Sequence, residues 1–274
     1  MGGRNEKIHK KIVIIISSLI LLTAVSLAGI YPSIYEFLCK TRVYENFSNN
    51  VEDIFSANIC VIGVTKNEDD VTIISYSTGA SGVIFSKNNN KYYALTAYHV
   101  FADKDKCLIY TINSDTIGEY RKKHTGNGHG SLDEYYGQFP EAKLEYICEE
   151  SDLAILSFET DEELAVVSIS QSMPAKGDKI LIVGNPEGEH FVKTYGKITS
   201  KNLTEFKVAD EMENKVLKHN AYVTFGTSGG AALNESMELV GIAVGGGTDF
   251  FGRFRYGVII PCDQICQFID ESNM

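Results

Sequence analysis

The sequence predicts a mostly β-stranded fold, a sandwich or a barrel, with a transmembrane helix at its N-terminus and one short helix at its C-terminus. Three observations lead to this prediction. Short runs rich in Val, Ile, Tyr and Phe recur from about residue 54, clusters of Gly, Asn, Asp and Lys separate these runs, and residues 12–30 hold no charged side chain. Many short strands divided by turn residues are typical of all-β sandwiches and barrels.

The first element along the chain is the apolar segment IVIIISSLILLTAVSLAGI, residues 12–30. A helix of this length spans roughly the 30 Å hydrocarbon core of a bilayer. The basic stretch RNEKIHKK precedes it, whereas only Lys40 and Arg42 follow nearby. The excess of positive charge on cytoplasmic flanks therefore places residues 1–11 in the cytoplasm as a basic tail, and everything after about residue 31 outside it.

A cleaved signal peptide is the alternative for this segment, because Ser26 and Ala28 provide the small residues of a cleavage site. The protein would then be secreted. The apolar run is longer than is usual in signal peptides, so we favour an uncleaved membrane anchor. Residues 31–53 read as a spacer, and residues 54–274 as one folded domain.

The expected strands are ICVIGV and the ranges 71–77, 82–86, 91–97, 107–113, 153–159, 179–184, 191–200, 238–245 and 254–261. One helical stretch, CDQICQFIDES, follows the last strand. It places Ile265, Phe268 and Ile269 on one face.

Charge and cysteine spacing exclude some classes of function. The net charge is −11. Because the N-terminus is basic, the rest of the chain is more acidic than this value, and it would repel a phosphate backbone. We therefore expect no nucleic-acid partner. The six cysteines form no C-x-x-C pair, so a zinc or redox site has no support, and their spacing does not select a disulfide pairing.

Ser228, in the stretch FGTSGGAAL, is either a turn residue or a nucleophile in a loop that requires glycine. A nucleophilic serine needs a base and a group that orients the base. Among six histidines, His99 alone ends an apolar strand, in YYALTAYHVF, where a rigid scaffold can present it. His219, by contrast, reads as part of a polar turn, VLKHN.

Asp152 is the candidate orienting carboxylate, because ESDLAILSF places it directly before an apolar run. His99, Asp152 and Ser228 occur in the order His, Asp, Ser. The α/β-hydrolase order is Ser, acid, His, and no histidine follows Ser228, so that fold is excluded. The observed order belongs to the architecture of two β-barrels with the site in the cleft between them.

With this order of residues, the sequence resembles the chymotrypsin-like serine peptidases. Within them, it most resembles the bacterial HtrA-like branch. LTAYHV is similar to L-T-x-x-H-V, SDLAIL to D-L-A-x-L, and GTSGGAAL to G-N-S-G-G-P-x-L. ASGVIFS, VGNPEGEHFVKTYGKITS and RYGVIIP resemble further stretches of that branch, and the resemblance runs from about residue 57 to 265. It implies two antiparallel six-stranded β-barrels and a serine endopeptidase that acts on protein or peptide substrates, which the uncharged segment 12–30 would anchor in the membrane.

The resemblance also implies roles for individual residues. Ser228 attacks the scissile carbonyl, His99 is the general base, Asp152 orients it, and the N–H groups of Gly226 and Ser228 form an oxyanion hole. No metal or organic cofactor is expected. The substrate pocket is expected at Tyr222, Val244, Gly245 and Gly246. No acid stands at position 222 and Ala243 replaces the histidine of Glu-specific relatives, so we expect a medium-sized apolar P1 residue.

The sequence departs from the family at two places. Thr227 stands where trypsin has the aspartate that captures a new N-terminus, so we expect no activation by N-terminal insertion. Residues 262–274 are too few for the PDZ domain typical of HtrA proteins, so we expect none. Two alternative functions remain: a catalytically silent binding module on the same fold, and an esterase that uses the same site.

Overall fold

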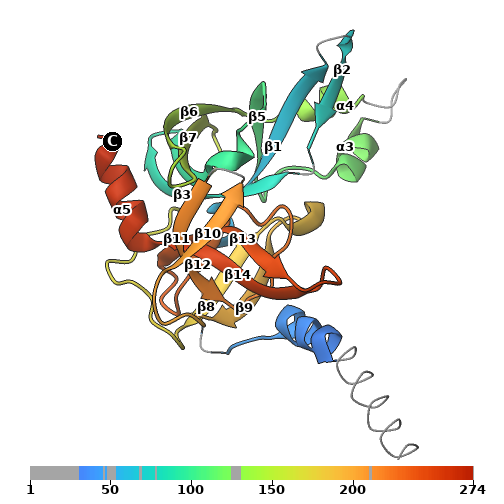
Figure 1. Cartoon of the computed structure of the whole chain (residues 1–274). Coiled ribbons are helices and arrows are strands. Elements are labelled where there is room, and N and C mark those ends of the chain that lie inside the picture. The colour runs from blue at the N-terminus through green and yellow to red at the C-terminus, as the bar shows by residue number, and fades with distance from the viewer. Residues whose placement is uncertain are drawn as a thin grey trace, which may run out of the picture.

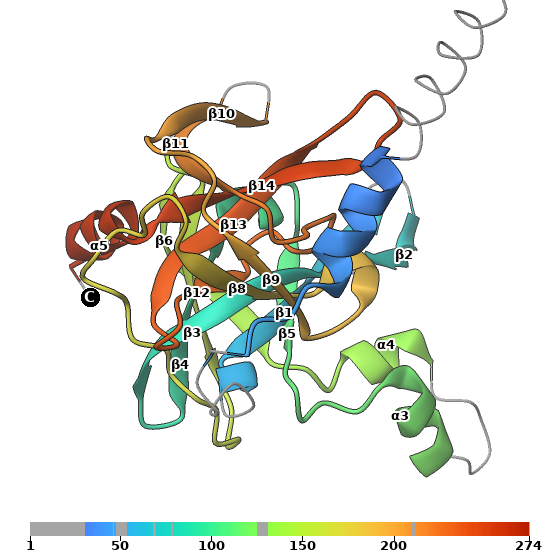
Figure 2. The ribbon, with the colours of Figure 1, turned by 90° about the horizontal axis from the view of Figure 1, so that it is seen from below.

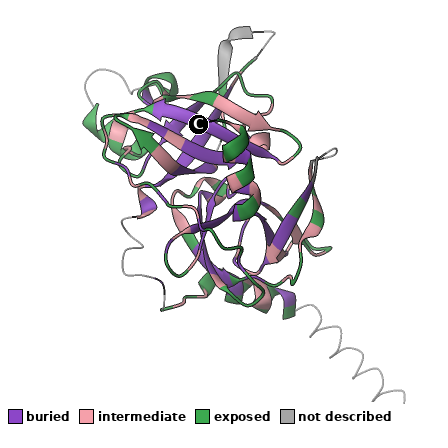
Figure 3. Cartoon of the chain, turned by 90° about the vertical axis from the view of Figure 1, so that its left-hand side faces the viewer, coloured by how far each residue is buried: buried purple, intermediate pink, exposed green. Residues whose placement is uncertain are grey.

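The computed structural model describes residues 31–45, 47, 54–67, 70–77, 79–124, 131–209 and 212–273. Their strands form two antiparallel sheets, one from each half of the chain (Figure 1). Buried residues follow the strands of both sheets, whereas exposed residues gather in the loops (Figure 3). The prediction of a mostly β fold is confirmed.

The first sheet contains a closed barrel. The strand order is β2-β1-β3-β4-β7-β6-β5, and β1 also pairs with β5, so six strands form a ring and β2 extends from the edge of β1. The strands are β1 (Asn58–Asn67), β2 (Asp70–Tyr76), β3 (Ala80–Asn88), β4 (Lys91–Ala97), β5 (Lys106–Tyr110), β6 (Glu141–Cys148) and β7 (Leu153–Glu159).

Three short helical elements of the first half were not predicted. The 3₁₀ helix η1 (Tyr98–Val100) follows β4, and α3 (Ile117–Lys123) and α4 (Leu132–Tyr136) lie between β5 and β6. Both α-helices begin with a capping box, in which a Thr or Ser side chain and a Glu three residues later satisfy the first N–H groups.

The second sheet does not close in the same way. Its order is β10-β11-β14-β13-β12-β8-β9. Among the described residues, the chain after β9 meets the end of β11 at the isolated bridge between Ile198 and His219 and at a few backbone hydrogen bonds beside it, such as Thr199 N–H to the carbonyl of Lys218 at 2.8 Å. The expected second closed barrel is therefore an open, curved sheet, because the β9 strand ends at Lys197 before a ladder to β11 can form. The strands are β8 (Lys179–Gly184), β9 (Val192–Lys197), β10 (Thr204–Ala209), β11 (Met212–His219), β12 (Ala231–Leu233), β13 (Leu239–Thr248) and β14 (Phe254–Pro261); η2 (Pro186–Gly188) precedes β9.

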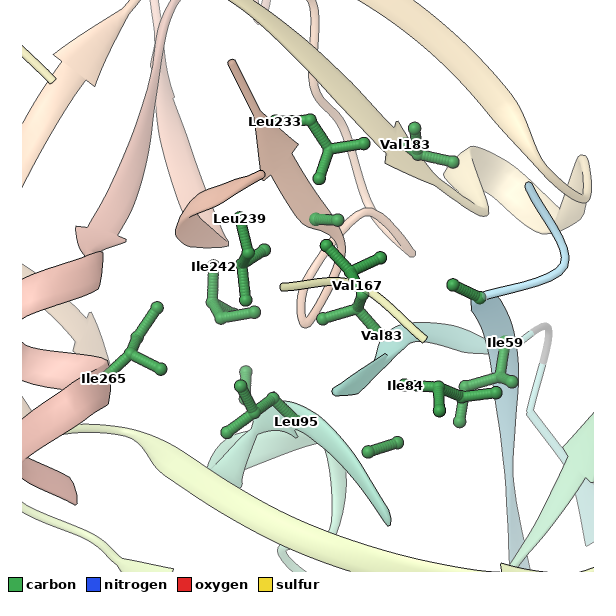
Figure 4. Close-up of a cluster of buried hydrophobic side chains, with 14 of the residues drawn as sticks. Ile59, Val83, Ile84, Leu95, Val167, Val183, Leu233, Leu239, Ile242 and Ile265 are labelled. Carbon is green, nitrogen blue, oxygen red and sulfur yellow. The ribbon is translucent and has the colours of Figure 1, made fainter. Parts of the chain in front are cut away.

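One apolar core joins the two sheets. Figure 4 shows Ile59, Val83, Ile84 and Leu95 of the first barrel facing Leu233, Leu239 and Ile242 of the second sheet. The C-terminal helix α5 (Cys262–Glu271) adds Ile265 to this core, together with Phe268, and Ile269 packs at its edge. The predicted apolar face of this helix is confirmed, and the shared core fixes the two sheets relative to one another.

Residues 31–41, which we had assigned to a spacer, are helical and pack against the second sheet (Figure 2). The Tyr35 hydroxyl donates to the carbonyl oxygen of Arg255 at 3.1 Å, Cys39 is fully buried, and the Arg42 guanidinium donates to the side-chain oxygen of Asn220 at 2.9 Å. This helix is therefore part of the folded unit.

Within the described residues, no helix is both long and apolar enough to cross a bilayer. The predicted basic tail, residues 1–11, and the predicted transmembrane helix, residues 12–30, lie outside the described residues. All six cysteines are unpaired in the part of the chain that is described, which includes each of them.

Candidate active site

The pairing of β4 with β7 brings His99 and Asp152 together. Ala97, the last residue of β4, lies opposite Leu153, the first residue of β7. Asp152 directly precedes Leu153, and His99 lies two residues beyond Ala97 in η1. The Tyr98 N–H donates to the backbone carbonyl of Asp152 at 3.1 Å. This bond fixes the end of β4 beside the start of β7.

The Asp152 carboxylate holds His99 at two places. One carboxylate oxygen lies 2.8 Å from His99 Nδ1, and the other accepts the backbone N–H of His99 at 2.9 Å. Asp152 is fully buried, whereas the His99 side chain keeps 28% of its surface exposed. Because a carboxylate accepts at Nδ1, that nitrogen carries the proton and Nε2 presents its lone pair. This arrangement suits a general base.

Ser228 lies in a tight turn that leads from Thr224 to β12. The Thr227 N–H donates to the carbonyl of Thr224 at 3.1 Å, and the Gly230 N–H donates to the carbonyl of Thr227 at 2.9 Å. The carbonyl of Ser228 itself accepts the N–H of Ser81 at 2.8 Å. The turn is thus fixed both internally and against the first barrel.

Two glycines make this turn possible. Gly226 has φ +92°, and a Cβ there would lie 2.3 Å from the carbonyl oxygen of Asn185. Gly229 has φ +84°, and a Cβ there would meet the carbonyl oxygen of Ser81. Both positions combine a left-handed backbone with a close approach to a neighbouring backbone carbonyl, so each excludes a side chain on two grounds.

The N–H groups of Gly226 and Ser228 are the expected oxyanion donors. Within the described part of the chain, neither of them donates to a protein acceptor. Both residues are half-exposed. Their neighbours Thr227, Gly229 and Gly230 all donate to backbone carbonyls. The two free N–H groups are therefore available to an external oxygen atom.

His99 and Ser228 line the same cavity, which has a volume of about 450 Å³. Of the expected pocket residues, Val244, Gly245 and Gly246 also line it. Tyr222 does not belong to the lining. Its ring packs edge-on against Phe254 and beneath the Lys40 ammonium group, on the side of helix 31–41.

Sequence reasoning missed one wall of this cavity. Phe206, Lys207 and Val208 of β10 line it, together with Val223 and Thr224 before the serine turn. The available signal was the alternation of Phe206 and Val208 with polar residues, which is typical of a half-exposed strand. Among the described residues that line the cavity, none carries a carboxylate.

His219 is not in a polar turn, as the sequence had suggested. It ends β11, is fully buried, and lies against Gly257 of β14. In the described structure neither ring nitrogen makes a well-aligned hydrogen bond, and the nearby backbone of Ala221 offsets only a small part of the effect of burial. Burial lowers the pKa of His219 to about 3, because the charged form would lose its hydration. The neutral ring thus behaves as a packing residue one layer behind the cavity wall.

Comparison with known proteins identifies the family. Residues 80–242 match the family described as the trypsin-like peptidase domain, and this range contains His99, Asp152 and Ser228. The chain belongs to the trypsin-like peptidase family. The resemblance to its HtrA-like branch is confirmed by relatives that carry that name.

Three of these trypsin-like relatives illustrate the extent of the similarity. The chain is 26% identical to the serine protease Do-like HtrB of Bacillus subtilis over 213 residues, which cover 72% of the chain and 41% of the relative. It is 25% identical to the Do-like HtrA of the same bacterium (74% and 43%) and 25% identical to that of Lactococcus lactis (82% and 50%). The chain thus spans half or less of the length of these relatives.

Proposed function

We propose that this chain is a serine endopeptidase that cleaves peptide bonds through an acyl-enzyme. The observation that carries the proposal is the His99–Asp152 pair, which leaves Nε2 of His99 available in the cavity that Ser228 also lines. The N–H groups of Gly226 and Ser228, which have no acceptor among the described residues, support the same chemistry.

In the proposed reaction, Ser228 Oγ forms a bond to the scissile carbonyl carbon while Nε2 of His99 accepts its proton. The negative charge that develops on the carbonyl oxygen is stabilised by the N–H groups of Gly226 and Ser228. His99 then gives the proton to the leaving amine, the C–N bond breaks, and an acyl-enzyme remains. Water, deprotonated by His99, hydrolyses this ester and restores Ser228. Asp152 stabilises the imidazolium at both stages.

Reaction with a fluorophosphonate probe tests this proposal. We expect the full chain in detergent to be labelled and to cleave peptide amides, and Ser228→Ala to lose both activities without a change in its thermal unfolding midpoint. Labelling without any amide cleavage, but with ester cleavage, would favour the esterase. Absence of labelling in a folded protein would favour the silent binding module.

We further propose that residues 12–30 anchor the protein in a membrane, with residues 1–11 in the cytoplasm and the protease domain outside it. The uncharged run and the basic flank support this topology. A reporter fused after residue 274 should be accessible only from the non-cytoplasmic side. Mature protein that begins near Gly29 would instead establish a cleaved signal peptide.

A further inference from the structure

Helix 31–41 carries an apolar stripe on the side that faces away from the protein. Tyr31, Ile34 and Leu38 follow one another at helical spacing, with Phe37 beside them, and each of these side chains is between 49% and 66% exposed. A surface helix normally presents its polar face to water. The outward stripe therefore lacks a partner within the described residues.

A second exposed apolar feature lies beside this helix. The turn between β13 and β14 carries Phe250 and Phe251, which are 96% and 73% exposed, with their rings in edge-to-face contact. Figures 1 and 2 both place this hairpin tip next to the beginning of helix 31–41. Adjacent aromatic side chains with so little cover are uncommon on a water-facing surface.

Hydrogen bonds fix the hairpin tip to the helix. The Arg253 guanidinium donates to the Ser33 hydroxyl at 3.2 Å, and the Glu36 carboxylate accepts the backbone N–H of Phe254 at 3.0 Å. Arg253 also pairs with Asp249 at 2.9 Å across the turn. The base of the hairpin tip is thus held against Ser33 and Glu36, within two helical turns of residue 31, where the uncharged segment 12–30 has just ended.

We propose that these two features form one membrane-facing surface (Tyr31, Ile34, Phe37, Leu38, Phe250 and Phe251) that rests in the interfacial layer of the lipid bilayer. The inference rests on the proposed anchor, because a transmembrane segment that ends at residue 30 brings this part of the domain to the bilayer. Apolar and aromatic side chains are favoured at the boundary between headgroups and acyl chains.

The membrane-facing surface determines how far the active-site cavity lies from the bilayer. Thr248 and Phe254 flank the hairpin tip, and both line the cavity. Since a strand advances about 3.3 Å per residue, the cavity begins within roughly 10 Å of the tip. Contact of the tip with the bilayer therefore holds the cavity beside the membrane surface. Polypeptide segments close to the membrane would be its most accessible substrates.

The natural chain contains no tryptophan, so Phe250→Trp provides a single fluorescent reporter at the tip. We would reconstitute the full chain in vesicles of phosphatidylcholine and phosphatidylglycerol, with and without brominated phosphatidylcholine. The matched control is Leu144→Trp on β6, an exposed apolar position in the first barrel. Phe251→Trp is a second reporter if the first variant folds poorly.

We expect the emission of Trp at position 250 to shift to shorter wavelength in vesicles and to lose most of its intensity to brominated lipid, whereas the control remains sensitive to aqueous acrylamide.

A protein that resists carbonate extraction, but whose tip is quenched only by acrylamide, overturns the membrane-facing surface and leaves the anchor intact. Shielding from both quenchers together with a cross-linked dimer shows that a second copy covers the surface, which also overturns it. Release by carbonate overturns the anchor and the surface together, while probe labelling reports proteolysis separately.

Discussion

Ser81 of the first barrel and Ser228 of the second sheet are joined by a backbone hydrogen bond of 2.8 Å, from the N–H of Ser81 to the carbonyl of Ser228. The side chain of Ser81 reinforces this link. Its hydroxyl donates to the carbonyl of Gly226 at 2.8 Å and accepts the N–H of Asn185, also at 2.8 Å. Ser81 is fully buried. One residue of the first barrel therefore holds both ends of the expected oxyanion turn.

We expect Ser81→Ala to lower kcat by about tenfold to a hundredfold, because small displacements of catalytic groups have effects of this size. The variant also leaves the buried N–H of Asn185 without its acceptor, which costs about 1–3 kcal/mol of unfolding free energy. Steady-state kinetics on a peptide amide and urea unfolding measure the two effects. Ser86→Ala, on the same strand, is the control. Equal kcat in both variants would show that Ser81 does not position the turn.

Gly226→Ala tests the shape of the turn. The new methyl group would meet the Asn185 carbonyl oxygen at 2.3 Å, and alanine would have to adopt the left-handed backbone of this position. We expect the N–H of residue 226 to turn away and kcat to fall by about 10²–10³, the typical effect of losing one oxyanion donor. Gly177→Ala has a similar φ, +102°, but beyond its chain neighbours no atom lies within 4 Å of the new methyl group. It should retain full activity, and a similar loss in both variants would assign the effect to general backbone strain.

Local sequence was sufficient to identify His99, Asp152 and Ser228 as candidates, because each ends or precedes a recognisable strand or glycine turn. The β4–β7 register brings His99 and Asp152 together, and the hydrogen bond from Ser81 to Ser228 places the serine turn against the first barrel. No local pattern encodes either contact. The strand β10 was missed because apolar and polar residues alternate in it over only a few positions, and charged residues stand on either side. His219 was misplaced because its burial arises from β14, which lies far along the chain.

Helix 31–41 shows a different limit of sequence analysis. Its apolar residues occur on both faces, so no amphipathic pattern distinguished it from a spacer with a proline, Pro32, near its start. The open second sheet could not be predicted either, since closure depends on whether residues after Lys197 continue to pair with β11. Both outcomes are set by tertiary contacts rather than by local propensity.

His219 should make stability depend on pH. Its pKa in the folded protein, about 3, lies below the ordinary value of 6.5. The unfolded chain therefore binds more protons below pH 6.5, and the free energy of unfolding falls as the pH falls toward 3. Between pH 7 and pH 5 we expect a loss of about 2 kcal/mol from this residue.

The variant His219→Met should remove this part of the pH dependence, because an apolar side chain of similar size takes no proton. Urea unfolding at pH 7 and pH 5 measures it. His124→Gln, which replaces an exposed histidine, is the control and should keep the dependence of the parent protein. An unchanged slope in His219→Met would mean that the ring is solvated when the protein is folded.

The apolar cavity predicts the P1 preference. Val223, Val244 and Ala243 line it, and no carboxylate in the described lining is available to pair with a buried ammonium or guanidinium group. Peptides with Val, Leu or Met at P1 should be cleaved with kcat/KM about tenfold or more above that of matched peptides with Lys or Arg. A faster reaction with Lys or Arg would require an acidic group from outside the described lining of the cavity.

Thr227 predicts that the site needs no activating cleavage. The residue is buried, its hydroxyl accepts the N–H of Thr224 at 3.3 Å, and it carries no charge. A new N-terminal ammonium group inserted beside it would be buried without a partner, which is strongly unfavourable. The turn is held instead by Ser81 and by its own backbone hydrogen bonds.

We therefore expect the intact full chain, and a variant cut at an engineered protease site between residues 47 and 54, to react with the fluorophosphonate probe at equal rates. Thr227→Asp should lower the unfolding free energy by a few kcal/mol, since it buries an unpaired carboxylate, whereas Thr227→Ser retains the hydrogen bond and should leave both stability and labelling unchanged. If labelling appears only after one defined cleavage, and a tag on the new terminus prevents it, a carboxylate other than residue 227 must receive that terminus and the turn is not ordered on its own.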